Sequence, residues 1–210
     1  MAGIEDFNKY FREYDLWFDK NELIYFSELN ALRHLIPKNG LGIEIGSGSG
    51  KFAIPLGVDL GIEPSEKMLE AAVNSGIKSI MGTAESLPVK NSIFDFALMV
   101  TTICFVDDPR KAFNEVFRVL KNQGSFIVGF VDKMSRIGQS YLKKKGKSKF
   151  YKSAKFYSVP EIYGFITSTG FSIEKTVQTL FKGDNSEVEN FKNGYGEGGF
   201  IGIQAIKKKD

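Results

Sequence analysis

The chain has 210 residues, 42% of them hydrophobic and 25% charged, which suits one globular domain with a full hydrophobic core. Its net charge of +3 is small, and no apolar run approaches the roughly 20 residues that a membrane-spanning helix needs. The first residues lack the basic and apolar regions of a secretion signal, and the single cysteine, Cys104, excludes an intrachain disulfide and a thiolate metal cage. We therefore expect a cytoplasmic protein without a metal site.

Two amphipathic helices are predicted at the start of the chain, because apolar residues recur there every three to four positions. The first helix carries Phe7, Tyr10, Phe11, Tyr14, Trp17 and Phe18. The second covers residues 22–36 and turns inward Leu23, Phe26, Leu29, Leu32, Leu35 and Ile36. Two interpretations of the aromatic stripe stay open: residues 1–37 form a lid whose Tyr10, Tyr14 and Trp17 close over a ligand, or the rings pack in the core.

Short apolar strands alternate with helices through the middle of the chain. Strands are expected over residues 41–45, 60–62, 79–81, 94–100 and 125–131. Ser65 is a plausible N-cap for a helix through Ala72, and Asp107 or Asp108 can cap a helix that runs from Pro109 to Leu120. Such alternation implies parallel strands joined by right-handed crossovers.

The end of the chain follows another pattern. A helix over residues 159–169 is followed by two strands, residues 171–181 and 199–206, whose polar, glycine-rich linker contains no helix. Two strands joined in this way form an antiparallel hairpin. The predicted fold class is α/β: a Rossmann-like, doubly wound, mostly parallel seven-stranded sheet with an antiparallel C-terminal hairpin, in a single domain over residues 1–210.

A lysine-rich segment, predicted to be a cap inserted at residues 133–157, follows the fifth strand. Nine of the 28 basic residues and none of the 25 acidic ones lie between Lys133 and Lys155. Aromatic residues are interleaved with them: Tyr141, Phe150, Tyr151, Phe156 and Tyr157. Such a patch can attract an anionic acceptor or nucleic acid, and the alternative is a solvated loop. Nucleic acid is the less favoured partner, because the chain is only mildly basic and contains no nucleic-acid motif.

The strongest chemical signal is the glycine loop after the first strand. Gly46, Gly48 and Gly50 let the backbone turn tightly and approach a ligand closely, and the N–H groups that follow can face a negative group. Glu63 ends the next strand, where a carboxylate can accept hydrogen bonds from both hydroxyls of a ribose. The pattern predicts a cofactor that contains a nucleoside.

Three alternatives compete for this loop. A P-loop is disfavoured because Phe52 replaces the magnesium-binding Ser or Thr and Ile45 replaces the first glycine. A dinucleotide site expects a small residue at the sixth position, where this chain has Lys51. The third alternative is a glycine turn that binds no ligand.

The motifs and their order resemble those of the class I methyltransferases that depend on S-adenosylmethionine (SAM). The segments that carry the resemblance are residues 44–50, 62–69, 82–88, 91–95, 106–109 and 116–124. Residues 14–18 are similar to an N-terminal element of the subgroup that includes the ubiquinone and menaquinone methyltransferases, and residues 156–171 resemble the family's entry into the terminal hairpin.

The resemblance implies in-line transfer of a methyl group from SAM to a small-molecule acceptor, leaving S-adenosylhomocysteine (SAH). It places the methionine part of SAM against Gly46, Ser47, Gly48 and Thr101, with Glu44 orienting the loop and the cofactor's amino group. It places the ribose on Glu63 and the adenine near Pro64, Met68, Thr83, Ala84 and Glu85.

Several positions depart from the family pattern. Thr83 stands where an aspartate often contacts the adenine, and Cys104 with Phe105 replaces a histidine-containing pair. Pro55 leaves room for only about one helical turn before the second strand. The sequence identifies no catalytic base, since His34 and Cys104 both suit structural roles. A SAM-binding protein without catalysis and a nucleotide-binding oxidoreductase stay open as alternatives, as do the acceptor atom and the oligomeric state.

Overall fold

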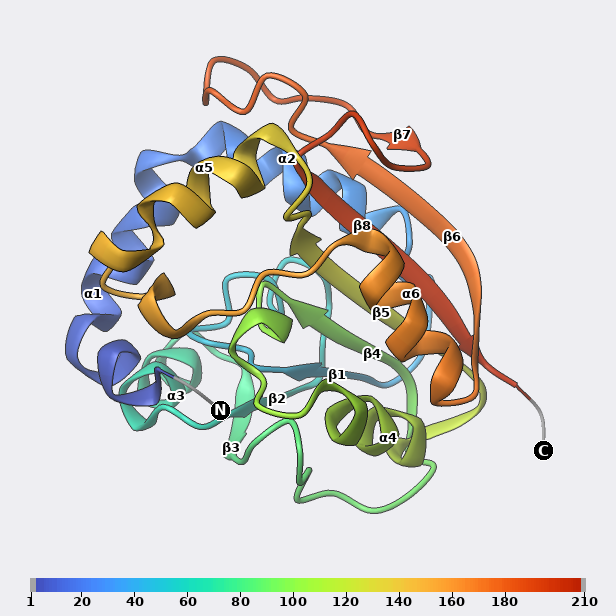
Figure 1. The fold of residues 1–210 in the computed structure, drawn as a ribbon. Coiled ribbons are helices and arrows are strands. Elements are labelled where there is room, and N and C mark those ends of the chain that lie inside the picture. Colours follow the sequence, from blue (N-terminus) through green and yellow to red (C-terminus); the bar gives the residue numbers. More distant parts are fainter. Residues whose placement is uncertain (1–2, 209–210) are drawn as a thin grey trace.

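Eight strands form one sheet in the described part of the chain, residues 3–208 of the computed structural model (Figure 1). Their order is β3-β2-β1-β4-β5-β8-β6-β7. The strands are β1 (Gly42–Ile45), β2 (Leu60–Glu63), β3 (Lys78–Met81), β4 (Phe94–Val100), β5 (Leu120–Val131), β6 (Phe171–Thr179), β7 (Lys192–Asn193) and β8 (Phe200–Lys207). The predicted ranges 1–37 and 1–210 include residues 1–2 and 209–210, which lie outside the described part.

The predicted α/β fold is confirmed, with one correction to the number of strands. Strands β1 to β5 are parallel to one another, and β6 and β8 are antiparallel, as expected. The sheet has eight strands rather than seven, because the predicted linker contains β7, which pairs with β6. Two residues of pairing carry no periodic signal, so the sequence could not reveal this strand.

The order of the parallel strands reverses at β1, which pairs with β2 on one side and with β4 on the other. The crossovers from these strands therefore run in opposite directions across the sheet. In an open α/β sheet this reversal leaves a crevice beyond the carboxyl ends of the strands, where ligands bind. The residues that follow β1, β2 and β4 are thus brought to one edge.

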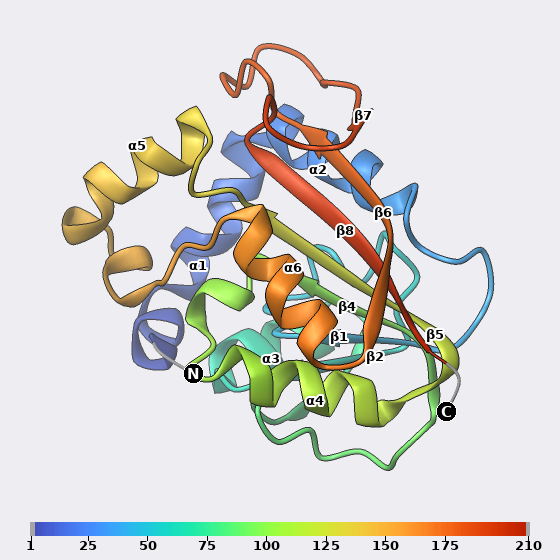
Figure 2. The same ribbon diagram turned by 45° about the vertical axis from the view of Figure 1, so that its right-hand side comes forward.

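Strand β8 lies between β5 and β6 and pairs with both (Figure 2). Strand β5 begins at Leu120, five residues before the predicted start, because residues 122–124, whose sequence Asn-Gln-Gly is typical of a turn, lie inside the strand. Gln123 adopts a φ of 64° there, and the β4–β5 register shifts between Phe94 and Phe96. An irregular strand entry of this kind looks like a turn in the sequence.

Helices cover both faces of the sheet. On one face, α4 (Pro109–Val119) and α6 (Val159–Ser168) bury apolar side chains such as Phe113 and Ile162. On the other, α2 (Glu22–Arg33) contributes Leu29 and Leu32 to the core, and α3 (Glu66–Asn74) contributes Ala72. Ser65 and Asp108 accept hydrogen bonds from the backbone of Met68 and Lys111, so both predicted caps form and Asp108 is the one used before α4.

Two helical expectations need correction. The predicted helix over residues 22–36 ends at Arg33, and Phe26 is 40% exposed instead of facing inward. The inner face of α2 instead contains Ser27 and Glu28. The segment after the glycine loop forms consecutive turns over residues 51–57 rather than a regular helical turn, as the shortness of the connection and Pro55 demand.

A cover lies over the carboxyl edge of the sheet and consists of α1 (Ile4–Lys20) and residues 136–153 (Figures 1 and 2). The second part contains α5 (Arg136–Lys144) and two short 3₁₀ helices, η2 (Lys145–Lys147) and η3 (Tyr151–Ser153). Glu13 of α1 pairs with Lys149 at 2.7 Å, and Asp6 pairs with Lys152 at 3.0 Å. Part of the lysine-rich segment thus holds the two halves of the cover together. No helix among residues 3–208 is long and apolar enough to cross a bilayer.

Candidate functional site

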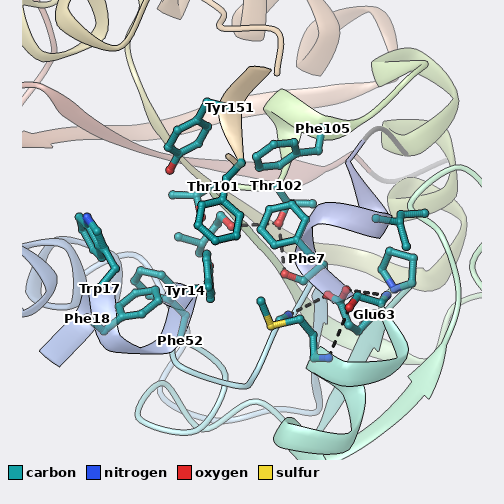
Figure 3. Close-up of a pocket in the computed structure, with 18 of the residues that line it drawn as sticks. Phe7, Tyr14, Trp17, Phe18, Phe52, Glu63, Thr101, Thr102, Phe105 and Tyr151 are labelled. Atoms are coloured by element: carbon teal, nitrogen blue, oxygen red, sulfur yellow. Dashed lines mark hydrogen bonds between the residues drawn. The ribbon is translucent and has the colours of Figure 1, made fainter. Parts of the chain in front are cut away.

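A pocket lies between the carboxyl edge of the sheet and the cover (Figure 3). The sheet side contributes Gly46, Gly48, Glu63, Pro64, Ser65, Met68, Val100, Thr101 and Thr102. The cover and α2 contribute Phe7, Glu13, Tyr14, Trp17, Phe18, Glu28, Tyr141, Phe150 and Tyr151. In Figure 3, Glu63 lies on one side of the pocket and Trp17 and Phe18 on the other. The pocket therefore has a polar half on the sheet and an aromatic half under the cover.

The glycine loop forms the floor of the polar half. Gly46 has a φ of 72°, which favours glycine, and a Cβ there would lie 2.4 Å from Cγ2 of Thr102. The Thr102 hydroxyl donates to the carbonyls of Gly46 and Val100, at 3.2 and 2.9 Å. Gly48 also has a positive φ, of 53°. The loop is thus fixed against the end of β4 in a form that needs glycine.

Glu63 is held at the end of β2 with its carboxylate facing the pocket. One oxygen accepts from the Gly48 N–H and the other from the Ser65 N–H, both at 2.8 Å. The side chain is 6% exposed, and burial raises the pKa of Glu63 to about 7 although both hydrogen bonds oppose that rise. Each oxygen keeps a further acceptor site, so the carboxylate can bind both hydroxyls of a ribose.

Glu44 and Ser47 lie behind the pocket rather than on its lining. The Glu44 side chain is 1% exposed, and its Oε2 has no hydrogen-bond partner in the described part of the chain. Burial and the neighbouring Glu63 raise the pKa of Glu44 well above its ordinary value. An unsatisfied buried acceptor beside the loop suits the role predicted for Glu44 in orienting the cofactor's amino group, because a bridging water can join the two. The Ser47 side chain instead points toward Gly61 on β2.

Helix α1 is tied to the polar half by side-chain hydrogen bonds. The Ser49 hydroxyl donates to Asp15, and the Ser65 hydroxyl donates to Oδ1 of Asn8 at 2.8 Å. Tyr14 lies over the glycine loop, 3.7 Å from the position that a Cβ of Gly48 would take, and lines the pocket together with Thr101. The predicted residues Tyr14, Trp17 and Thr101 therefore share the pocket with Glu63.

Other predicted residues do not reach the lining. Tyr10 faces the lysine-rich segment, with the Lys149 ammonium 4.6 Å from its ring centre. Ala84 is buried in the core, Thr83 forms an isolated bridge with Ser86, and Glu85 accepts from the Asp107 backbone at 2.8 Å. The adenine edge predicted for residues 83–85 is thus not formed by side chains that line this pocket.

The ordinary candidates for a base have structural roles. Burial raises the pKa of the Cys104 thiol to about 12, which keeps it protonated, and His34 lies outside the pocket with its ring centre 4.6 Å from that of Phe191. Burial likewise raises the pKa of Tyr141 to about 12. The pocket tyrosine Tyr141 therefore offers a hydrogen-bond donor rather than a base at neutral pH.

Glu28 lines the aromatic half from α2 and was not expected there from the sequence. The side chain is 4% exposed, and burial raises the pKa of Glu28 to about 8. The signal was present in the sequence: Glu28 stands one helical turn before Leu32 and two turns before Leu35, on the apolar face of the predicted helix. Phe7 and Phe105 also line the pocket and were not assigned to it.

Glu28→Gln is expected to change the pH dependence of stability. A carboxyl whose pKa is raised on folding favours the folded state less as the pH rises from its ordinary pKa of 4.5 toward about 8. We compare the free energy of unfolding of the variant with that of the wild type. The difference should shift in favour of the variant by roughly 1–2 kcal/mol as the pH rises from about 4 to about 9. Urea unfolding at both pH values measures this, and a constant difference would contradict the pKa direction.

Comparisons with known proteins agree with the geometry. A family model described as a methyltransferase domain matches residues 43–128. The chain is similar to a SAM-dependent methyltransferase of Thermotoga maritima, described as a possible histamine N-methyltransferase. The two are 48% identical, the match covers 99% of this chain and 100% of that one, and the TM-score is 0.95.

Two further relatives match this chain at 46% and 30% identity. An uncharacterised protein of Methanocaldococcus jannaschii is 46% identical over 202 residues, which cover 96% of this chain and 98% of that protein. A ubiquinone/menaquinone biosynthesis C-methyltransferase of Rickettsia felis is 30% identical over 156 residues, which cover 66% of this chain and 60% of that protein.

Proposed function

This chain belongs to the class I methyltransferase family and is a SAM-dependent enzyme, and we propose that it transfers the methyl group to a small-molecule acceptor bound in the aromatic half of the pocket. The observation that carries the proposal is that one continuous pocket runs from Glu63 to the rings under the cover. A cofactor held at Glu63 and an acceptor held among the rings would share one enclosed space.

The polar half supplies the groups that suit the cofactor. Glu63 would bind the ribose hydroxyls, and Pro64 and Met68 would pack near the adenine. Gly46, Gly48 and Thr101 would lie along the methionine part, with Glu44 acting behind them. When bound, SAM supplies an electrophilic methyl group on a sulfonium, so the chain needs no nucleophile of its own.

The contribution of the chain is to orient the acceptor and exclude water. Trp17, Phe18 and Tyr151 present ring surfaces to the pocket, and Tyr14 spans its two halves. Alignment of two bound reactants can lower a barrier by roughly 7–11 kcal/mol in favourable cases. We propose that the predicted lid (residues 1–37) and the predicted insertion (residues 133–157), which contain the two parts of the cover, act together over an in-line transfer.

The lining bears on the charge of the acceptor. Three cations of the lysine-rich segment are paired with carboxylates: Lys133 with Glu161, Lys149 with Glu13 and Lys152 with Asp6. Among the described residues, no lysine or arginine lines the pocket. This favours a neutral or cationic acceptor over the anionic one that the segment's composition suggested. It also leaves no row of positive charges that could guide nucleic acid into the pocket.

The single cysteine favours a location in the reducing cytoplasm.

Calorimetry with SAM, SAH and NAD(P) tests the cofactor, and turnover over a panel of small amines, phenols and carboxylates tests the reaction. We expect SAH to bind and at least one acceptor to be methylated. Binding of SAH without turnover of any acceptor would favour a non-catalytic SAM-binding protein. Binding of NAD(P) with no response to SAM or SAH would favour an oxidoreductase and overturn the proposal.

A further inference from the structure

A buried carboxylate without a partner lies in the aromatic half of the pocket. Glu28 comes from the inner face of α2 and is 4% exposed. No donor or cation among the described residues forms a hydrogen bond or an ion pair with it. Buried charges in proteins are normally paired or hydrogen-bonded, because removing an ion from water is costly. The fold itself therefore leaves the carboxylate of Glu28 unexplained.

The negative charge of Glu28 helps to raise the pKa of tyrosines from three elements. Its charge acts on Tyr25 of α2, on Tyr141 of α5 and on Tyr151 of η3. The charge of Glu63 acts instead on Tyr14 and Glu44. The two carboxylates thus serve different parts of the pocket, and Glu28 belongs to the part beneath residues 136–153 rather than to the cofactor loop.

The surroundings of Glu28 suit a cation. The rings of Trp17, Phe18, Tyr141 and Tyr151 line the same pocket, and aromatic faces attract ammonium groups. The other carboxylate on the cover side, Glu13, is already paired with Lys149 at 2.7 Å. A ligand amino group is the partner that would neutralise Glu28 and also fit an aromatic enclosure.

We propose that the methyl acceptor carries a protonated amino group and that the Glu28 carboxylate binds it. The inference rests on the proposed function, because it names the acceptor class of the same pocket. Glu28 is the specificity residue for the cation, and the surrounding rings hold the remainder of the acceptor.

The free protein holds Glu28 with a pKa raised by burial to about 8, so the group is largely protonated at neutral pH. An ammonium group bound beside it favours the ionised form. Binding at pH 7 is therefore expected to release a proton. Calorimetry in two buffers that differ in ionisation enthalpy measures this release, and it should vanish in Glu28→Gln.

The test uses SAH-saturated protein and three arylethylamines: 2-phenylethylamine, tyramine and histamine. The matched neutral and anionic probes are 2-phenylethanol and 3-phenylpropionate. For the wild type we expect at least one amine to bind 10-fold or more tightly than both matched probes. Glu28→Gln should abolish that preference while the affinity for SAH stays within twofold of the wild-type value. Glu13→Gln, the matched control on the same lining, should retain the preference.

The outcomes separate the inference from the proposed function. If SAH binds but the alcohol or the carboxylate binds as well as every amine, or if the preference survives in Glu28→Gln, the amine inference is wrong. If Glu28→Gln weakens SAH, the carboxylate serves the ammonium of the cofactor instead. If the wild type does not bind SAH, the proposed function itself fails. Thermal unfolding of both variants confirms that each measurement is made on folded protein.

Discussion

Glu63→Ala is expected to weaken the binding of SAH by about 1–3 kcal/mol, or roughly 5- to 150-fold. The carboxylate would accept both ribose hydroxyls, and it also fixes the Gly48 and Ser65 N–H groups at 2.8 Å. Alanine removes all of these acceptors and leaves two backbone donors beside the pocket without partners. Titration calorimetry with SAH measures the loss.

Glu66→Ala is the matched control for this experiment. Glu66 lies three residues further along, in the first turn of α3, and its side chain is exposed. Its removal should leave the affinity for SAH nearly unchanged. An unchanged affinity in Glu63→Ala as well would remove the ribose assignment.

Gly46→Ala is expected to lower the free energy of unfolding by roughly 2–4 kcal/mol and to abolish measurable binding of SAH. Two effects combine at this position. The φ of 72° disfavours any residue with a Cβ, and the new atom would lie 2.4 Å from Cγ2 and 2.5 Å from Oγ1 of Thr102. Thr102 is itself buried and hydrogen-bonded to Gly46, so the loop must move. Urea unfolding and calorimetry measure the two losses.

Gly76→Ala separates the two effects. Gly76 has a φ of 98°, but nothing lies within 4 Å of the position of its Cβ. Alanine there should cost only about 1 kcal/mol, from backbone strain alone, and should leave SAH binding intact. Equal losses in the two variants would show that close packing against Thr102 contributes nothing.

The sequence predicted the polar half of the site because its signals are local. Gly46, Gly48 and Glu63 follow directly after two short strands, and parallel strands bring their carboxyl ends to one edge. Thr101, which the family resemblance implied, follows β4 at the same edge. The fold class could also be predicted, because it depends on the alternation of strands and helices along the chain. It does not depend on which side chains touch each other.

The aromatic half could not be predicted in the same way, because it depends on contacts between distant segments. Glu28 and Tyr141 lie more than 100 residues apart in the chain and meet only because α5 folds over the sheet edge. The prediction that Phe26 faces inward from α2 was also wrong, since this side chain is 40% exposed. Periodicity identifies an apolar stripe but not which part of it meets a cavity.

The position of β8 has a consequence for synthesis of the chain on the ribosome. This strand pairs with β5 through seven residue pairs and with β6 along its whole length. While residues 200–207 remain in the exit tunnel, β5 and β6 both present unsatisfied edges, and such edges are templates for association with other chains. Completion of the sheet therefore waits until residues 200–207 have left the tunnel, and until then both strand edges stay open to other chains.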